Sequence, residues 1–92
     1  MFVPVRIILM TEKSNKIILL SQLSVGEKAI IEDFIFDGDE SERLEEMGLT
    51  RGETIEMIRY APLGDPLEIK IRGYFLSLRK DEAERIKIRI LS

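Results

Sequence analysis

The side chains that most often carry out chemistry in proteins are absent, because the 92 residues of this sequence include neither cysteine nor histidine. Their absence excludes disulfides, thiolate and imidazole metal sites, cysteine nucleophiles and the usual general base near neutral pH. The G-x-x-x-x-G-K-[ST] and G-x-G-x-x-G phosphate-binding patterns and the G-x-S-x-G pattern of hydrolases are missing too. We therefore expect no catalytic residue, no enzyme activity and no cofactor, and a protein that works by binding a partner.

Carboxylates are the remaining groups that could hold a metal ion, and six of them fall within residues 37–46. Hard oxygen ligands need no histidine or cysteine to bind a divalent cation. The segment begins with the spacing of an EF-hand calcium loop, but Glu42 and Gly48 stand where that loop needs its glycine and its bidentate glutamate. A solvated acidic segment with a helix cap is favoured, and no metal site is predicted.

Arg43 is the one basic residue in this segment and has two interpretations. An arginine supplied to the GTPase site of a partner can accelerate phosphoryl transfer by about 10³ to 10⁵ fold. Glu40 and Glu46, three residues to either side, would instead pair with Arg43 on the solvated face of a helix. We favour the ion pairs and keep a GTPase-regulating role for Arg43 as the alternative.

The composition and length limit the classes of protein to which this chain can belong. With 45 % hydrophobic and 34 % charged residues, the chain has the composition of a globular protein, and 92 residues enclose one core. The longest apolar run, at 7–10, is far shorter than the roughly 20 residues that span a bilayer, and the N-terminus lacks signal-peptide features. We expect a cytoplasmic protein without direct membrane insertion. A net charge of −3 disfavours nucleic acid as a partner.

Short β-prone runs alternate with turn residues along the chain. We expect strands at 27–36, 54–60, 67–72, 75–78 and 86–90, an apolar run at 17–20 and one turn of helix at 81–85. A short helix is predicted at 40–47, with Asp39 as its N-cap, Gly48 as a left-handed residue after its end, and Leu49 packed back onto its last turn. Strands this short avoid exposed edges by closing on themselves. The expected fold is all-β with one short helix, a small SH3-like barrel of five or six strands.

Residues 1–16 are predicted to be an N-terminal extension ahead of a barrel domain at 17–92. Within it, residues 2–10 are mostly β-branched, aliphatic or aromatic, with Pro4 near the start, which is typical of an edge strand or an arm. An unpaired run of this kind in water invites association. We expect it to pair with a barrel edge of its own chain, or to form a homodimer contact through residues 1–12.

Three turn motifs occur in one order and register: RLEEMGLTRG at 43–52, APLGDP at 61–66 and GYFLSLR at 73–79. Together they resemble the ferrous iron transport protein A (FeoA) family across roughly residues 19–91. The resemblance implies an SH3-like barrel that assists the membrane ferrous iron permease with a G-protein domain, FeoB, at the inner face of the membrane. It leaves open whether the domain activates, restrains or assembles the transporter.

Similar barrels form the C-terminal domain of metal-dependent repressors, so a metal-responsive regulatory or nucleic-acid-binding barrel is the alternative function. We expect no winged-helix or dimerisation segment ahead of the predicted barrel. The missing metal ligands and the acidic pI also weigh against the alternative. We therefore expect a free-standing accessory protein of ferrous iron uptake.

The predicted partner surface lies on turns. Two prolines stiffen the 61–66 turn, so that little entropy is lost on docking, and Leu63 occupies its tip. Exposed apolar residues at the end of the predicted helix would extend this patch. The two tyrosines either line an aromatic peptide groove or belong to the core, and the sequence does not decide between these. The expected partner-binding residues are Met47, Leu49, Tyr60, Pro62, Leu63, Asp65 and Tyr74.

Overall fold

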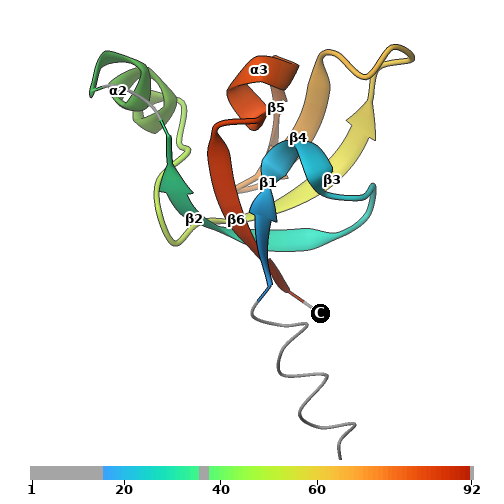
Figure 1. Ribbon diagram of the computed structural model, residues 1–92, viewed down its shortest axis with the longest axis horizontal. Helices are drawn as coiled ribbons and strands as arrows, with labels where there is room; N and C mark the ends of the chain where they lie inside the picture. Colours follow the sequence, from blue (N-terminus) through green and yellow to red (C-terminus); the bar gives the residue numbers. More distant parts are fainter. Residues whose placement is uncertain (1–15, 36–37, 92) are drawn as a thin grey trace, which may run out of the picture.

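The computed structural model describes residues 16–35 and 38–91, and its main element is one curved antiparallel sheet of six strands (Figure 1). The elements are β1 (Ile17–Leu19), the 3-10 helix η1 (Leu20–Gln22), β2 (Lys28–Phe34), α2 (Gly38–Glu46), β3 (Thr54–Tyr60), β4 (Leu67–Ile71), β5 (Tyr74–Leu78), α3 (Lys80–Ala83) and β6 (Ile86–Leu91). The strand order is β1-β6-β2-β3-β4-β5. The expected all-β arrangement with a short helix is confirmed.

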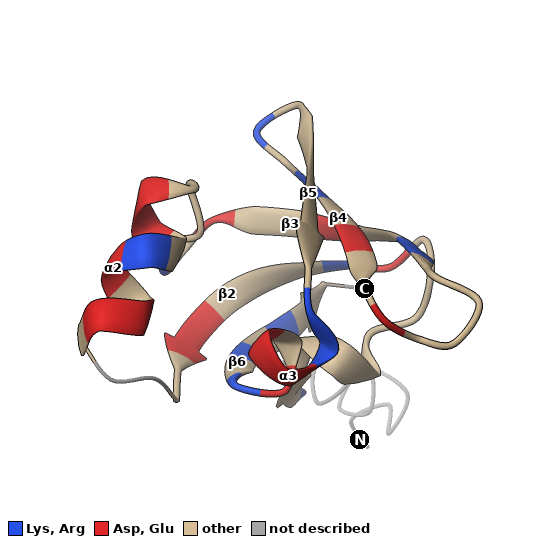
Figure 2. Cartoon of the chain, turned by 90° about the horizontal axis from the view of Figure 1, so that it is seen from above, with Lys and Arg blue, Asp and Glu red and all other residues tan. Residues whose placement is uncertain are grey.

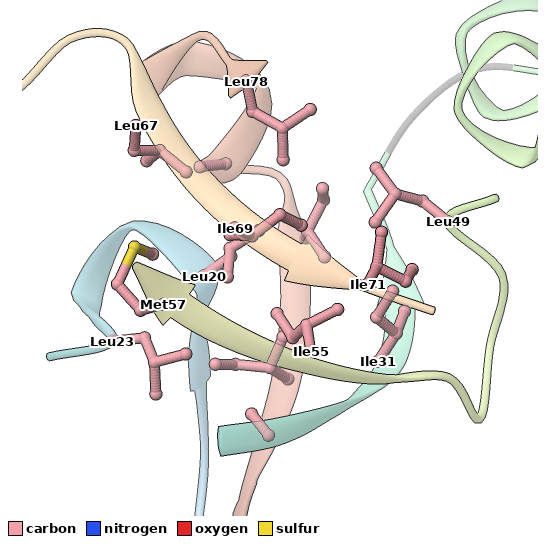
Figure 3. Close-up of a cluster of buried hydrophobic side chains, with 14 of the residues drawn as sticks. Leu20, Leu23, Ile31, Leu49, Ile55, Met57, Leu67, Ile69, Ile71 and Leu78 are labelled. Atoms are coloured by element: carbon pink, nitrogen blue, oxygen red, sulfur yellow. The ribbon is translucent and has the colours of Figure 1, made fainter. Parts of the chain in front are cut away.

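Period-two alternation puts one face of each strand into the core. In β4, Leu67, Ile69 and Ile71 are buried, whereas Glu68 and Lys70 between them are half-buried and exposed. Side chains from β2, β3, β4, β5 and β6 meet on this inner face (Figure 3). Irregular registers within β2 and within β3 bend the sheet around them. The core is entirely apolar within the part of the chain that the structure describes.

Helix α2 ends as the sequence predicts. Gly48 has a φ of +96°, and its N–H donates to the Glu45 carbonyl while the Leu49 N–H donates to the Leu44 carbonyl, both at 2.9 Å. This double hydrogen bond is a Schellman motif, in which the residue after the glycine packs against the last turn. Leu44 and Leu49 are both fully buried. The apolar pair therefore fixes the end of α2 to the core.

The start of α2 differs from the prediction. The helix begins at Gly38, so that Asp39 lies in its first turn and is not the N-cap. Asp39 and Glu40 there stabilise the helix, because the positive end of the helix dipole attracts carboxylates.

The predicted strand or arm at 2–10 lies outside the described residues. In residues 16–35 and 38–91, no helix is long and apolar enough to cross a membrane.

Candidate partner-binding surface

The strand register separates the two parts of the predicted partner surface. Leu67 pairs with Leu78 at one end of the β4–β5 hairpin, and Ile71 pairs with Tyr74 at the other. Four residues of β-strand span about 13 Å, because each residue advances about 3.3 Å. The 61–66 turn therefore lies at the far end of β5 from Tyr74, and the strand itself joins the two regions.

The 61–66 turn presents the most exposed large apolar side chain of the described part of the chain. Leu63 at its tip is 94 % exposed, and Pro62 and Asp65 are exposed as well. The turn is closed by a hydrogen bond of 2.7 Å from the Gly64 N–H to the Ala61 carbonyl. One Asp65 carboxylate oxygen accepts a hydrogen bond of 2.9 Å from the backbone N–H of Lys80. Asp65 thus fixes the turn to the start of α3, while the side chain of Leu63 remains in solvent.

Three of the expected partner-binding residues are core or near-core residues. Leu49 is fully buried by the Schellman contact, so its assignment as a surface contact is wrong. Met47 and Tyr60 are half-buried and pack against the core. The Tyr60 hydroxyl lies 2.5 Å from the carbonyl oxygen of Leu23 and 3.1 Å from that of Ser21. Its role in the fold is to hold the segment after η1 against β3.

Tyr74 links β5 to the end of α2. Its hydroxyl donates a hydrogen bond of 2.5 Å to the carbonyl oxygen of Met47. A Cβ atom at position 48 would overlap this hydroxyl, so the glycine is required for the close approach as well as for its positive φ. Part of the Tyr74 side chain stays in solvent, at 42 % exposed. Tyr74 therefore joins β5 to the end of α2 and remains partly exposed to solvent.

A shallow groove of about 440 Å³ lies beside the end of β5. It is lined by Arg43, Asp65, Pro66, Ser77, Leu78, Arg79 and Glu82. The guanidinium of Arg43 on α2 forms an ion pair across it with Glu82 of α3. The expected pairs of Arg43 with Glu40 and Glu46 are not found, and Glu40 instead lies 3.4 Å from Arg85. Arg43 is thus engaged in linking the two helices.

Three features of this surface were not identified from the sequence. Strand β5 forms one edge of the sheet, and Figure 2 shows it beside β4. Phe75 on its outer face is 58 % exposed. Arg79, which lines the groove, forms no ion pair with another described residue. All three features depend on the order of the strands in the sheet and on which distant residues pair. The alternation of residues in the motif at 73–79 predicts a strand but not its place in the sheet.

Ion pairs with arginine lower the pKa of two partly exposed carboxyl groups, those of Asp33 and Glu53. Hydrogen bonds from Arg51 and from the Phe34 N–H lower the pKa of Asp33. A hydrogen bond from Arg72 lowers the pKa of Glu53 and raises that of Arg72. These pairs are structural. Among residues 16–35 and 38–91, acidic side chains do not gather into a group of three or more that could hold a metal ion.

Comparison with known proteins shows which family this chain belongs to. The FeoA domain family matches residues 18–90. The chain is 37 % identical over 73 residues to an Fe(2+) transport protein A/Fe(2+) transporter FeoB fusion protein of Porphyromonas gingivalis, a match that covers 79 % of this chain and 9 % of the fusion protein. The chain thus spans less than a tenth of that relative.

Solved structures of FeoA proteins have a fold similar to that of this chain. The FeoA protein of Chlorobium tepidum superposes with a TM-score of 0.77 at 37 % identity, covering 82 % of this chain and 71 % of that one. Stenotrophomonas maltophilia FeoA in complex with zinc, a prokaryotic SH3 domain protein, superposes with a TM-score of 0.66 at 29 % identity, covering 77 % and 88 %. The expected SH3-like architecture is confirmed. A manganese-dependent transcriptional repressor shares the fold at 12 % identity, which shows the fold alone.

Proposed function

Because this chain belongs to the FeoA family, we propose that it is a cytoplasmic accessory protein of ferrous iron uptake that binds the FeoB permease. The observation that supports this is the fusion of a similar domain to FeoB in one polypeptide of P. gingivalis. Fusion raises the effective concentration of one module at the other to the millimolar range, which helps only if the two act on each other. The proposed site of action is the inner face of the membrane.

The exposed turn and β5 offer the surface for this contact. Leu63 is an apolar anchor held on a closed turn, and Pro62 and Asp65 flank it in solvent. Anchors of this kind carry most of the binding energy of an interface when they enter a pocket of the partner. The partially exposed Tyr74 and Phe75 extend the apolar surface along the strand. We therefore place the partner on the side of the molecule that carries the 61–66 turn and β5.

A direct GTPase role of Arg43 would require its ion pair with Glu82 to open first. The proposed function does not need this step. The chain acts through binding, and the nucleotide chemistry belongs to the G-protein domain of the permease. Arg43→Ala should then leave the effect of this protein on GTP turnover largely intact.

Reconstitution tests the proposal. The permease of the same organism is placed in vesicles, and its GTP turnover and ferrous iron uptake are measured with and without this protein. Binding together with a change in either rate supports the proposed function. Absence of binding to the permease, with both rates unchanged, contradicts it. A variant with Leu63→Asp serves as the matched control, since it alters the exposed turn and leaves the core intact.

A further inference from the structure

The outer edge of β5 carries free backbone groups. Within residues 16–35 and 38–91, β4 is the single strand paired with β5. The hairpin between them turns at Arg72 and Gly73, which have positive φ angles of 51° and 84°. Such a two-residue turn makes the flanking residues, Ile71 and Tyr74, a hydrogen-bonded pair, and hydrogen-bonded and non-hydrogen-bonded pairs then alternate. The backbone N–H and C=O groups of Phe75 and Ser77 therefore point away from β4.

Side chains beside this edge define what can bind there. Phe75 and Ser77 are exposed on the outer face of the sheet, so an added strand would meet an apolar and then a small residue. Arg79 follows two residues later and is exposed on the groove. Every other described arginine pairs with a carboxylate, as Arg43, Arg51, Arg59, Arg72, Arg85 and Arg89 do. Arg79 thus has a guanidinium available for a carboxylate from outside the chain.

We propose that β5 accepts an extended segment of the permease's cytoplasmic region as an added antiparallel or parallel strand. This rests on the proposed function. The segment bears an apolar side chain that packs on Phe75 and, four residues along the same face, an aspartate or glutamate that pairs with Arg79. Main-chain hydrogen bonds supply affinity in this mode of recognition, and the side chains supply specificity.

Charge disfavours a second copy of this chain as the occupant. Antiparallel self-pairing centred on Leu76 would bring Arg79 of one copy opposite Gly73 of the other, next to Arg72, so that positive charges would lie close together at both ends of the pair. An acidic segment would instead meet Arg79, which forms no ion pair with another described residue.

A proline in the edge tests the added strand. Ser77→Pro removes an N–H that points to the free edge and leaves the β4 ladder intact, and edge strands tolerate proline at such positions. Ser77→Ala keeps the N–H and is the matched control. With the cytoplasmic region of the permease as the probe, we expect Ser77→Pro to weaken binding at least about tenfold and Ser77→Ala to bind like the wild type. Arg79→Glu should weaken binding by a similar factor.

Amide hydrogen exchange of the wild-type protein gives a second measurement that requires no variant to fold. On binding of the permease region, the amides of Phe75 and Ser77 should exchange at least about tenfold more slowly. Binding without this protection, or equal binding by Ser77→Pro, overturns the added strand and leaves the proposed function standing. No binding by the wild type overturns both. A concentration-dependent dimer that Ser77→Pro abolishes would assign the edge to a second copy and overturn the proposed occupant.

Discussion

The hydroxyl of Tyr74 donates a hydrogen bond to the carbonyl oxygen of Met47 and so ties the first residue of β5 to the end of α2. Gly48 follows Met47 directly, and its missing side chain leaves the space that the hydroxyl occupies. The C-terminal carbonyls of a helix have no partner within the helix, so a tyrosine hydroxyl that reaches this end satisfies a group that would otherwise need water. The helix end and the sheet edge are therefore coupled.

Tyr74→Phe removes this hydrogen bond while it keeps the ring. We expect the free energy of unfolding to fall by about 0.5–1.5 kcal/mol, the usual net value of one such bond, and amides at the end of α2 to exchange faster. Thermal unfolding and hydrogen exchange measure the two effects. Ser77→Ala, on the outer face of the same strand, should change stability by less than about 0.5 kcal/mol. Equal stability of Tyr74→Phe and the wild type would show that water replaces the hydroxyl without cost.

Gly48→Ala adds a Cβ atom to a left-handed residue and into the space of the Tyr74 hydroxyl. Gly26→Ala is the matched control, because Gly26 has a similar φ of +88° and a Cβ there would have no neighbour within 4 Å. Backbone strain costs both variants about 1–2 kcal/mol, whereas only Gly48→Ala also displaces the tyrosine. We expect Gly48→Ala to unfold at the lower temperature. In the Tyr74→Phe background the difference should shrink, and no coupling would contradict the close approach.

Acid should weaken the fold through two ion pairs. Arg51 holds the pKa of Asp33 below its ordinary 3.8, and Arg72 holds the pKa of Glu53 below its ordinary 4.5. A carboxyl with a lowered pKa in the folded state stabilises the fold above its unfolded pKa, and this stabilisation is lost as the pH falls through the folded value. Melting temperature should therefore decline below about pH 5.

Glu53→Gln tests the assignment, because it removes one of the two titrating groups. The acid decline of its melting temperature should be shallower than that of the wild type between about pH 5 and pH 3. Glu45→Gln, on the exposed surface of α2, leaves both ion pairs intact and should follow the wild-type profile. If Glu53→Gln also followed the wild-type profile, other carboxyl groups would dominate acid unfolding.

Local signals in the sequence were sufficient where neighbours along the chain decide the structure. The alternation in β4 and the bounds of β3 follow from side-chain period and turn residues. The end of α2 at Gly48 follows from the need for a positive φ. The same motif packs Leu49 back onto the last turn, as predicted, and this contact leaves its side chain no exposed surface. Its assignment to the partner surface was therefore wrong, because the contact within the chain uses the whole side chain.

Long-range relationships could not be predicted in this way. Arg43 pairs with Glu82, 39 residues away, and not with the helical neighbours that spacing favours. The register of β4 with β5 puts Leu63 and Tyr74 at opposite ends of a hairpin. Which strand forms the edge of the sheet depends on strand order, and no local pattern encodes it. The edge at β5, which carries the further inference, was therefore visible only in the structure.

Deletion of residues 1–12 tests the predicted arm. Strand β1 is the other edge of the sheet, Ile17 in it is 52 % exposed, and a shallow groove of about 410 Å³ runs beside it. If residues 2–10 pair with this edge in the same chain, the deletion lowers the melting temperature. If they pair with a second copy, it changes the mass measured by light scattering. A full-length variant with serine at 7–9 separates apolar contact from length, and unchanged stability and mass in both variants would contradict the prediction.

Leu63→Asp is the sharpest test of the partner surface, because Leu63 lies at the tip of the 61–66 turn with 94 % of its surface in solvent. The change places a charge where the wild type offers an apolar anchor. Loss of a central anchor costs about 2 kcal/mol, or roughly thirty-fold in affinity, whereas a surface change moves folding stability by about 0.5 kcal/mol or less. We expect weaker binding to the permease by titration calorimetry and a melting temperature close to that of the wild type.

Leu49→Ala gives the opposite pattern and serves as the comparison. Leu49 is fully buried, so its truncation should destabilise the fold by about 2–5 kcal/mol. Below the lowered melting temperature, the folded fraction should bind the permease with wild-type affinity, because this side chain does not reach the surface. Unchanged affinity of Leu63→Asp would move the interface away from the turn. A large fall in its melting temperature would show that Leu63 packs on the protein itself and that its exposure does not mark a binding site.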